Sequence, residues 1–159
     1  PVASMNEERH SHASVVLDGQ VYAIGGCGVD ASQIDTVEAY DPQADSWQQV
    51  ASMPQALTAH AAAAMGGKIY VTGGNDQGAP VNSVYVYDPQ ADVWAQLASM
   101  GTARRLHASA VVGGKLCVFG GSDASGRLST VEVYDPASDS WAQVSSLPSA
   151  RTGMAGVAL

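Results

Sequence analysis

The chain has little positive charge, few cysteines and no long apolar run. Seven Lys and Arg stand against fifteen Asp and Glu, and the net charge of −8 excludes a broad basic surface of the kind that binds nucleic-acid backbones. Apolar runs fall short of the roughly 20 residues that span a bilayer, and no charged-then-apolar leader opens the sequence. We therefore expect no nucleic-acid partner, no membrane association and a cytoplasmic location.

Cysteine is scarce, with only Cys27 and Cys117 among 159 residues. Two cysteines at unrelated positions do not predict a disulfide framework or a metal site. Cys117 stands where Tyr22 and Tyr70 stand in related segments, and we expect it to be a small buried residue. With 46% hydrophobic and 14% charged residues, the chain has the composition of one packed globular domain. No cofactor is predicted.

The clearest pattern in the sequence is an internal repeat. The phrases YDPQADSW, YDPQADVW and YDPASDSW begin at Tyr40, Tyr87 and Tyr134, and each is preceded by a Gly pair. The opening VASM matches VASM at 50–53 and LASM at 97–100. We expect a single domain over 1–159, with units at about 12–50, 60–97 and 107–144 and a partial fourth unit at 148–159.

Each unit predicts four short strands, which we call A to D in chain order. Asp18-Gly19, Gly66-Gly67 and Gly113-Gly114 separate strands A and B, and such pairs suit two-residue hairpin turns that need positive φ. Asp-Pro separates strands C and D and starts a tight turn, because Pro presets φ and Asp bonds back to the backbone. Four antiparallel strands in each repeat predict the blades of an all-β propeller.

A Gly pair, then Tyr-Asp-Pro about 14 residues later, then Trp seven residues after that Tyr, resembles the Kelch repeat over essentially the whole chain. The resemblance implies that the Gly pair ends strand B and that Tyr and Trp pack between blades. These aromatic residues bury large areas, and Gly lets backbones approach closely. The structural residues implied are Gly25, Gly26, Gly73, Gly74, Gly120, Gly121, Tyr40, Tyr87, Tyr134, Trp47, Trp94 and Trp141.

Three blades do not make a ring. Propellers close with about four to eight blades, so three leave two apolar faces open. Both ends of the chain also carry a strand A, near 12–17 and near 153–159. Two interpretations remain: two copies complete a six-bladed ring as a homodimer, with the duplicated strand exchanged or displaced at the junction, or the chain is a piece of a longer propeller. We favour the homodimer, because a lone half-ring should aggregate.

The arginines gather in the loops between strands B and C and between strand D and the next strand A, whereas Asp fills the turns at the opposite end. Variable loops on a rigid scaffold are common binding sites, and Arg suits carboxylates and phosphates. The resemblance implies that Arg before strand A and polar residues after the Gly pair line a pocket, although Leu57 breaks this pattern. We expect an acidic or phosphorylated peptide partner, unless the arginines are simply solvated. The predicted binding residues are Arg9, Arg104, Arg105, Arg127, Arg151, Cys27, Asn75, Asp76, Ser122 and Asp123.

An enzymatic role is the alternative interpretation. Some Kelch-type propellers are copper oxidases or sialic-acid mutarotases, so the resemblance leaves open sugar-acid binding or a mutarotase activity. His12, His60 and His107 occupy equivalent positions and invite a metal hypothesis, but repeat-equivalent residues favour a packing role. We predict no catalytic residue and no metal site.

Overall fold

The computed structural model describes residues 2–156, and this part of the chain is all β. No helix in it is long and apolar enough to cross a membrane. The strands form three antiparallel four-stranded sheets, here called blades 1 to 3, and the small hairpin of β7 (Asn75–Asp76) and β8 (Ala79–Pro80). The all-β class and the four-stranded blades are confirmed.

The strands of each blade follow one another outward in the order A to D. Blade 1 contains β1 (Ala13–Leu17), β2 (Gln20–Cys27), β3 (Gln33–Asp41) and β4 (Ser46–Val50). Blade 2 contains β5 (Ala61–Met65), β6 (Lys68–Thr72), β9 (Val84–Asp88) and β10 (Val93–Gln96). Blade 3 contains β11 (Ala108–Val112), β12 (Lys115–Phe119), β13 (Val131–Asp135) and β14 (Ser140–Val144). The extra strand expected at 153–159 is not formed over 153–156, and 157–159 lie outside the described residues.

The turns have the conformations that their residues favour. Asp18 and Gly19 have φ of 50° and 79°, which is the left-handed backbone of a two-residue hairpin. After strand C, Asp41 Oδ1 accepts the backbone N–H of Gln43 at 2.8 Å. These local bonds set the register in which Tyr40 pairs with Trp47.

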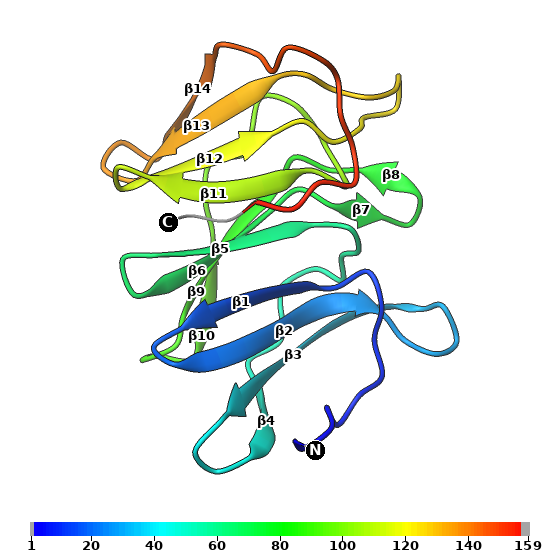
Figure 1. Cartoon of the computed structure of the whole chain (residues 1–159), viewed down its shortest axis with the longest axis vertical. Helices are drawn as coiled ribbons and strands as arrows, with labels where there is room; N and C mark the ends of the chain where they lie inside the picture. Colours follow the sequence, from blue (N-terminus) through cyan, green and yellow to red (C-terminus); the bar gives the residue numbers. More distant parts are fainter. Residues whose placement is uncertain (1, 157–159) are drawn as a thin grey trace.

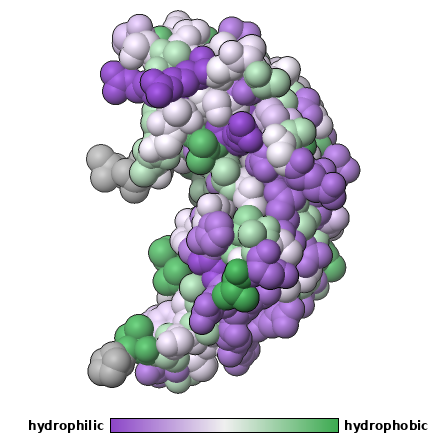
Figure 2. Space-filling model, turned by 90° about the vertical axis from the view of Figure 1, so that its right-hand side faces the viewer, coloured by the Kyte–Doolittle hydropathy of each residue, from purple (hydrophilic) through white to green (hydrophobic). Residues whose placement is uncertain are grey.

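The apolar core lies between blades, because neighbouring sheets pack face to face. One cluster joins blades 1 and 2 and includes Ile24, Val37 and Tyr87, and a second joins blades 2 and 3 and includes Val84 and Leu116. Figure 1 shows the three sheets stacked along the molecule. The β1, β5 and β11 strands are neighbours, and a cavity of about 340 Å³ lies against all three. In side view the molecule is a crescent rather than a closed ring (Figure 2).

The outer faces of blades 1 and 3 have no neighbouring blade in the described chain. Cys117 lies on the outer face of blade 3 and is half-buried, so the expectation of a buried Cys117 is wrong. Tyr22 and Tyr70, its equivalents, are only 4% and 8% exposed because a following blade covers them. The greater exposure of Cys117 therefore arises from the absence of a covering blade and not from the type of side chain.

Candidate ligand-binding loop face

Arg104, a predicted binding residue, is buried inside blade 3. Its side chain has no exposed surface, and its guanidinium pairs with Glu132 at 2.6 Å. The same guanidinium donates to the backbone oxygens of Gly120 at 2.8 Å and Thr130 at 3.2 Å. The Arg104 side chain therefore joins the end of strand B to strand C inside the blade, whereas the sequence interpretation expected it at the surface of a pocket.

Arg9 repeats this arrangement in blade 1, and its side chain is likewise withdrawn from the surface where the sequence analysis expected it. Its side chain is fully buried, lies 3.5 Å from Glu38 and 3.4 Å from Glu7, and donates to the backbone oxygens of Gly25 and Thr36 at 3.0 and 2.9 Å. A buried ion pair needs such additional hydrogen bonds, because removing two charges from water is costly.

The second repeat replaces both members of this ion pair at once. Leu57 stands in the Arg position and Tyr85 in the Glu position, and they are 0% and 6% exposed in the core between blades 1 and 2. The Tyr85 hydroxyl donates to Gln55 Oε1 at 3.0 Å. Because both partners change together, the pair is a packing unit of the blade. Comparison of the repeats contained this signal, which the sequence analysis missed.

Arg105, Arg127 and Arg151 remain at the surface, and backbone hydrogen bonds bring them together at the loop end of blade 3. Arg105 and Ser122 exchange two backbone hydrogen bonds of 2.9 Å, and Ser122 also forms a β-bridge with Arg127. Next to Ser122, the backbone N–H of Gly121 donates to the oxygen of Arg151 at 2.7 Å. We call these three arginines the blade 3 basic patch.

Asp123 is the carboxylate nearest to this patch in the chain, but it is engaged in its own turn. It accepts the hydroxyl and the backbone N–H of Ser125, both at 2.7 Å. These hydrogen bonds hold the pKa of Asp123 below its usual range. The blade 3 basic patch thus groups three arginines beside a carboxylate that is hydrogen-bonded within its own turn, on a protein that is acidic as a whole.

The polar residues that follow the second Gly pair are bonded within the protein. Asn75 Oδ1 accepts the guanidinium of Arg105 at 2.9 Å, so Arg105 reaches from blade 3 to blade 2. Asp76 accepts Gln55 Nε2 at 2.9 Å. Both residues border the loop face, and these hydrogen bonds hold Asn75 Oδ1 and Asp76 Oδ2 against neighbouring side chains.

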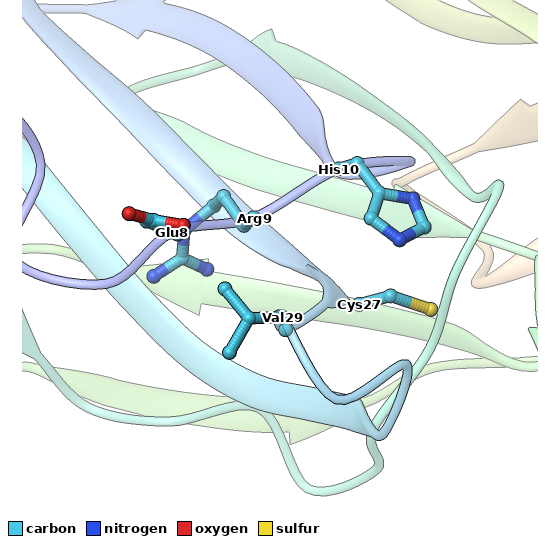
Figure 3. A pocket seen from close by; sticks show the side chains of 6 residues that line it. Glu8, Arg9, His10, Cys27 and Val29 are labelled. Atoms are coloured by element: carbon cyan, nitrogen blue, oxygen red, sulfur yellow. The ribbon is translucent and has the colours of Figure 1, made fainter.

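Cys27 lies at the loop end of blade 1, where the surface is acidic. It lines a cavity of about 220 Å³ with Glu8, His10 and Val29 (Figure 3). An adjoining cavity of about 500 Å³ is bordered by Glu8 and Asp30. The loop face is therefore polar along the crescent, with carboxylates at blade 1 and arginines at blade 3.

The opposite end of the blades is acidic, as the sequence predicts. Lys68 and Lys115 compensate part of this charge through ion pairs of 2.7 and 2.9 Å with Asp88 and Asp135. The hydrogen bond from Lys68 lowers the pKa of Asp88. Blade 1 has Gln20 in place of the lysine, so its turn carries the charge of its carboxylates uncompensated.

The repeated phrase forms a clamp on the segment that enters its blade. In blade 2, Asp92 accepts the Tyr87 hydroxyl at 2.7 Å and the backbone N–H of Ala51 at 2.8 Å, while Trp94 Nε1 donates to the oxygen of Ala51 at 2.8 Å. Asp92 has a φ of 52°, which Asp tolerates better than most residues. The same bonds join Asp45, Tyr40 and Trp47 to Ala3, and Asp139, Tyr134 and Trp141 to Ala98.

Two of the repeated histidines, His60 and His107, pack on the Gly pair of the preceding blade. A Cβ on Gly73 would lie 2.8 Å from Cε1 of His107, so the ring occupies the space that the glycine leaves. Burial lowers the pKa of His60 to about 4 and that of His107 to about 3. His107 Nε2 also lies 2.9 Å from Thr72 Oγ1. Among residues 2–156, no three His, Cys, Asp or Glu side chains gather into a possible metal site.

Comparison with known proteins identifies relatives. The family model of the KLHDC2/KLHL20/DRC7 Kelch-repeats domain matches residues 2–159. Kelch-like protein 35 of Mus musculus is 37% identical over 76 residues, which are 48% of this chain and 13% of that protein. Kelch-like protein 33 of Homo sapiens is 36% identical over 73 residues, 46% of this chain and 14% of that protein. These alignments thus span about one seventh of the length of the relatives.

The fold has a solved counterpart. The structure described as "Structure of YjhT" superimposes with a TM-score of 0.81 at 19% identity. The match covers 95% of this chain but only 56% of that one. At this identity the likeness shows the fold alone, and the crescent corresponds to little more than half of that chain.

Proposed function

Since this chain belongs to the Kelch-repeat family, we propose that it acts as a protein-interaction module that binds an acidic or phosphorylated peptide at the blade 3 basic patch. The observation that carries the proposal is the convergence of Arg105, Arg127 and Arg151 at one loop end of a net-acidic protein. Arg guanidinium groups bind carboxylates and phosphates through paired hydrogen bonds.

The state of each arginine sharpens the proposal. Arg127 and Arg151 are exposed, and Arg151 Nε donates a hydrogen bond to Ser149 Oγ at 3.2 Å. Arg105 is half-buried and held by Asn75. We therefore assign Arg127 and Arg151 to contact with the peptide and Arg105 to the floor of the site.

The test is fluorescence anisotropy with two peptides of one backbone sequence, one rich in Asp and Glu and one carrying phosphoserine. Arg127→Glu should weaken binding at least about tenfold, since it replaces a charge-assisted hydrogen bond with repulsion. Lys115→Glu is the matched control, because it changes the net charge equally at the opposite end of the same blade. Equal weakening by both variants would mean that only net charge matters and would contradict the site.

We also propose that two copies of the chain close a six-bladed ring head to tail, with blade 3 of each against blade 1 of the other. The chain covers 56% of the larger propeller, so about two copies supply the blades of a ring of that kind. Light scattering should give twice the mass of one chain. A monomer at all concentrations would contradict the ring but not the peptide site.

A further inference from the structure

The two ends of the chain carry the same segment. Residues 2–17 read VASMNEERHSHASVVL and residues 144–159 read VSSLPSARTGMAGVAL, so Arg9 matches Arg151. Residues 50–65 and 97–112 are the internal copies of this segment, which joins two blades and provides strand A of the second. Residues 2–156 form three blades, and the fourth copy of the segment follows the third blade.

The outer faces of blades 1 and 3 are equivalent to the two faces that meet in each junction within the chain. These junctions lie between blades 1 and 2 and between blades 2 and 3. Tyr87 is 1% exposed in the junction between blades 1 and 2, whereas its equivalent Tyr40, on the outer face of blade 1, is only half-buried. Val84 is fully buried between blades 2 and 3, whereas its equivalent Val131, on the outer face of blade 3, is only half-buried. A second copy brings together the same two faces.

The last described residues already occupy part of this place. The backbone N–H of Gly121 donates to the oxygen of Arg151 at 2.7 Å, as that of Gly74 donates to the oxygen of Arg104 at 2.8 Å in the internal junction. Residues 151–156 therefore lie on blade 3 where the segment entering a following blade would lie.

Met154 occupies the position of a junction histidine. Its Cε approaches the space above Gly120, as His107 Cε1 approaches the space above Gly73. In a closed ring the second copy's His12 needs the place that Met154 holds. His12 and Met154 cannot occupy it together, because Met154 already fills the space that Gly120 leaves open.

We infer that residues 151–156 form an internal cap that imitates the entering segment of a second copy and must leave blade 3 before the ring closes. Arg151 therefore belongs to the blade 3 basic patch only while the cap is in place, and in the closed ring Arg105 and Arg127 remain there. This inference rests on the two-copy ring proposed above. The second copy keeps its own residues 2–10 in place, because Glu38 accepts the N–H groups of Asn6 and Glu7, both at 3.0 Å. The equivalent of Asn6 in the cap segment is Pro148, which has no N–H to donate.

The test compares the dimer dissociation constants of the full chain and of two cap variants by sedimentation velocity. One variant ends at residue 148. The other is Gly156→Val in the full chain, because a Cβ there would lie 2.6 Å from the backbone oxygen of Ser109 and would push the cap off β11. Both should dimerise about tenfold more tightly, since closure no longer breaks the three backbone hydrogen bonds that residues 151–156 make with the rest of the chain. Ala137→Val, at the exposed turn of blade 3, is the control and should match the full chain.

Each outcome decides between the proposals. Equal dissociation constants for the full chain and the cap variants would overturn the cap and leave the ring standing. Weaker dimers of the cap variants would also overturn it, because the segment would then belong to the interface. Monomers throughout would overturn the ring and the cap together.

The position of Cys117 gives an independent test of the same junction. Tyr22 packs against Tyr87 with ring centroids 6.1 Å apart, and Tyr70 packs against Tyr134 at the same distance. In the junction between copies the corresponding pair is Cys117 and Tyr40, so one ring is missing. Cys117→Tyr should tighten the dimer about 2- to 12-fold. An unchanged constant would contradict this pairing of faces.

Discussion

Acidification should destabilise this protein through two buried histidines. Burial holds the pKa of His60 at about 4 and that of His107 at about 3, against 6.5 for the exposed side chain. Between these values the unfolded chain binds protons that the folded chain does not. The stabilising contribution is therefore complete above pH 6.5 and is lost as the pH falls below it.

The magnitude follows from these shifts. On going from about pH 7.5 to about pH 5, each histidine should remove about 2 kcal/mol from the free energy of unfolding, and the two together about 4 kcal/mol. That is a large part of the ~5–15 kcal/mol by which folded domains are stable. Asp88 and Asp123 contribute little in this window, because hydrogen bonds hold their pKa values below the usual range.

Urea denaturation followed by Trp fluorescence at the two pH values measures this loss. The double variant His60→Gln, His107→Gln should be less stable at neutral pH but should lose most of its pH dependence. His10→Gln is the control, because it replaces an exposed histidine outside the two buried junctions. If the double variant loses the same 4 kcal/mol or so on acidification, the buried histidines are not the cause and the reasoning fails.

Three further predictions concern the stability of the blades. Glu132→Ala should lower the free energy of unfolding by about 3–5 kcal/mol, because it leaves Arg104 buried without its partner. The double variant Arg104→Leu, Glu132→Tyr copies the second repeat and should lower it far less. Midpoints of urea denaturation compare the two variants. Gly73→Ala should lower the free energy of unfolding by at least about 2 kcal/mol, because its φ is 53° and a Cβ would overlap the Arg104 oxygen. A Cβ at Gly66 would meet nothing within 4 Å, so Gly66→Ala should lower it only by the strain of its positive φ. Asp92→Ala should lower the thermal midpoint, since Tyr87 and the entering segment lose a shared acceptor.

The strands, their order and the Gly-Gly and Asp-Pro turns could be predicted from the sequence because their causes are local. Asp18-Gly19 turns the chain by its own backbone preferences, and Tyr40 with Trp47 marks adjacent strands by its spacing. The period of the repeat then gives the blade and the family. These features need no knowledge of what lies across a junction.

The candidate site could be predicted only in part. The sequence placed Arg9 and Arg151 together, since both precede a strand A. The structure buries Arg9 against Glu38, about thirty residues away in the chain, and leaves Arg151 at the surface. No local property of an arginine distinguishes the two.

The amino-acid sequence is enough to define the strands and turns of each repeat unit. Hydrogen bonds within a hairpin and the apolar alternation of a strand depend on neighbours in the chain. Which equivalent residues become buried core, clamp or exposed surface depends on the tertiary structure. The outcome depends on whether another blade covers them: Tyr87 is buried and Tyr40 only half-buried. Burial sets the effective dielectric and the available partners, and so one repeated residue acquires different chemistry at each blade.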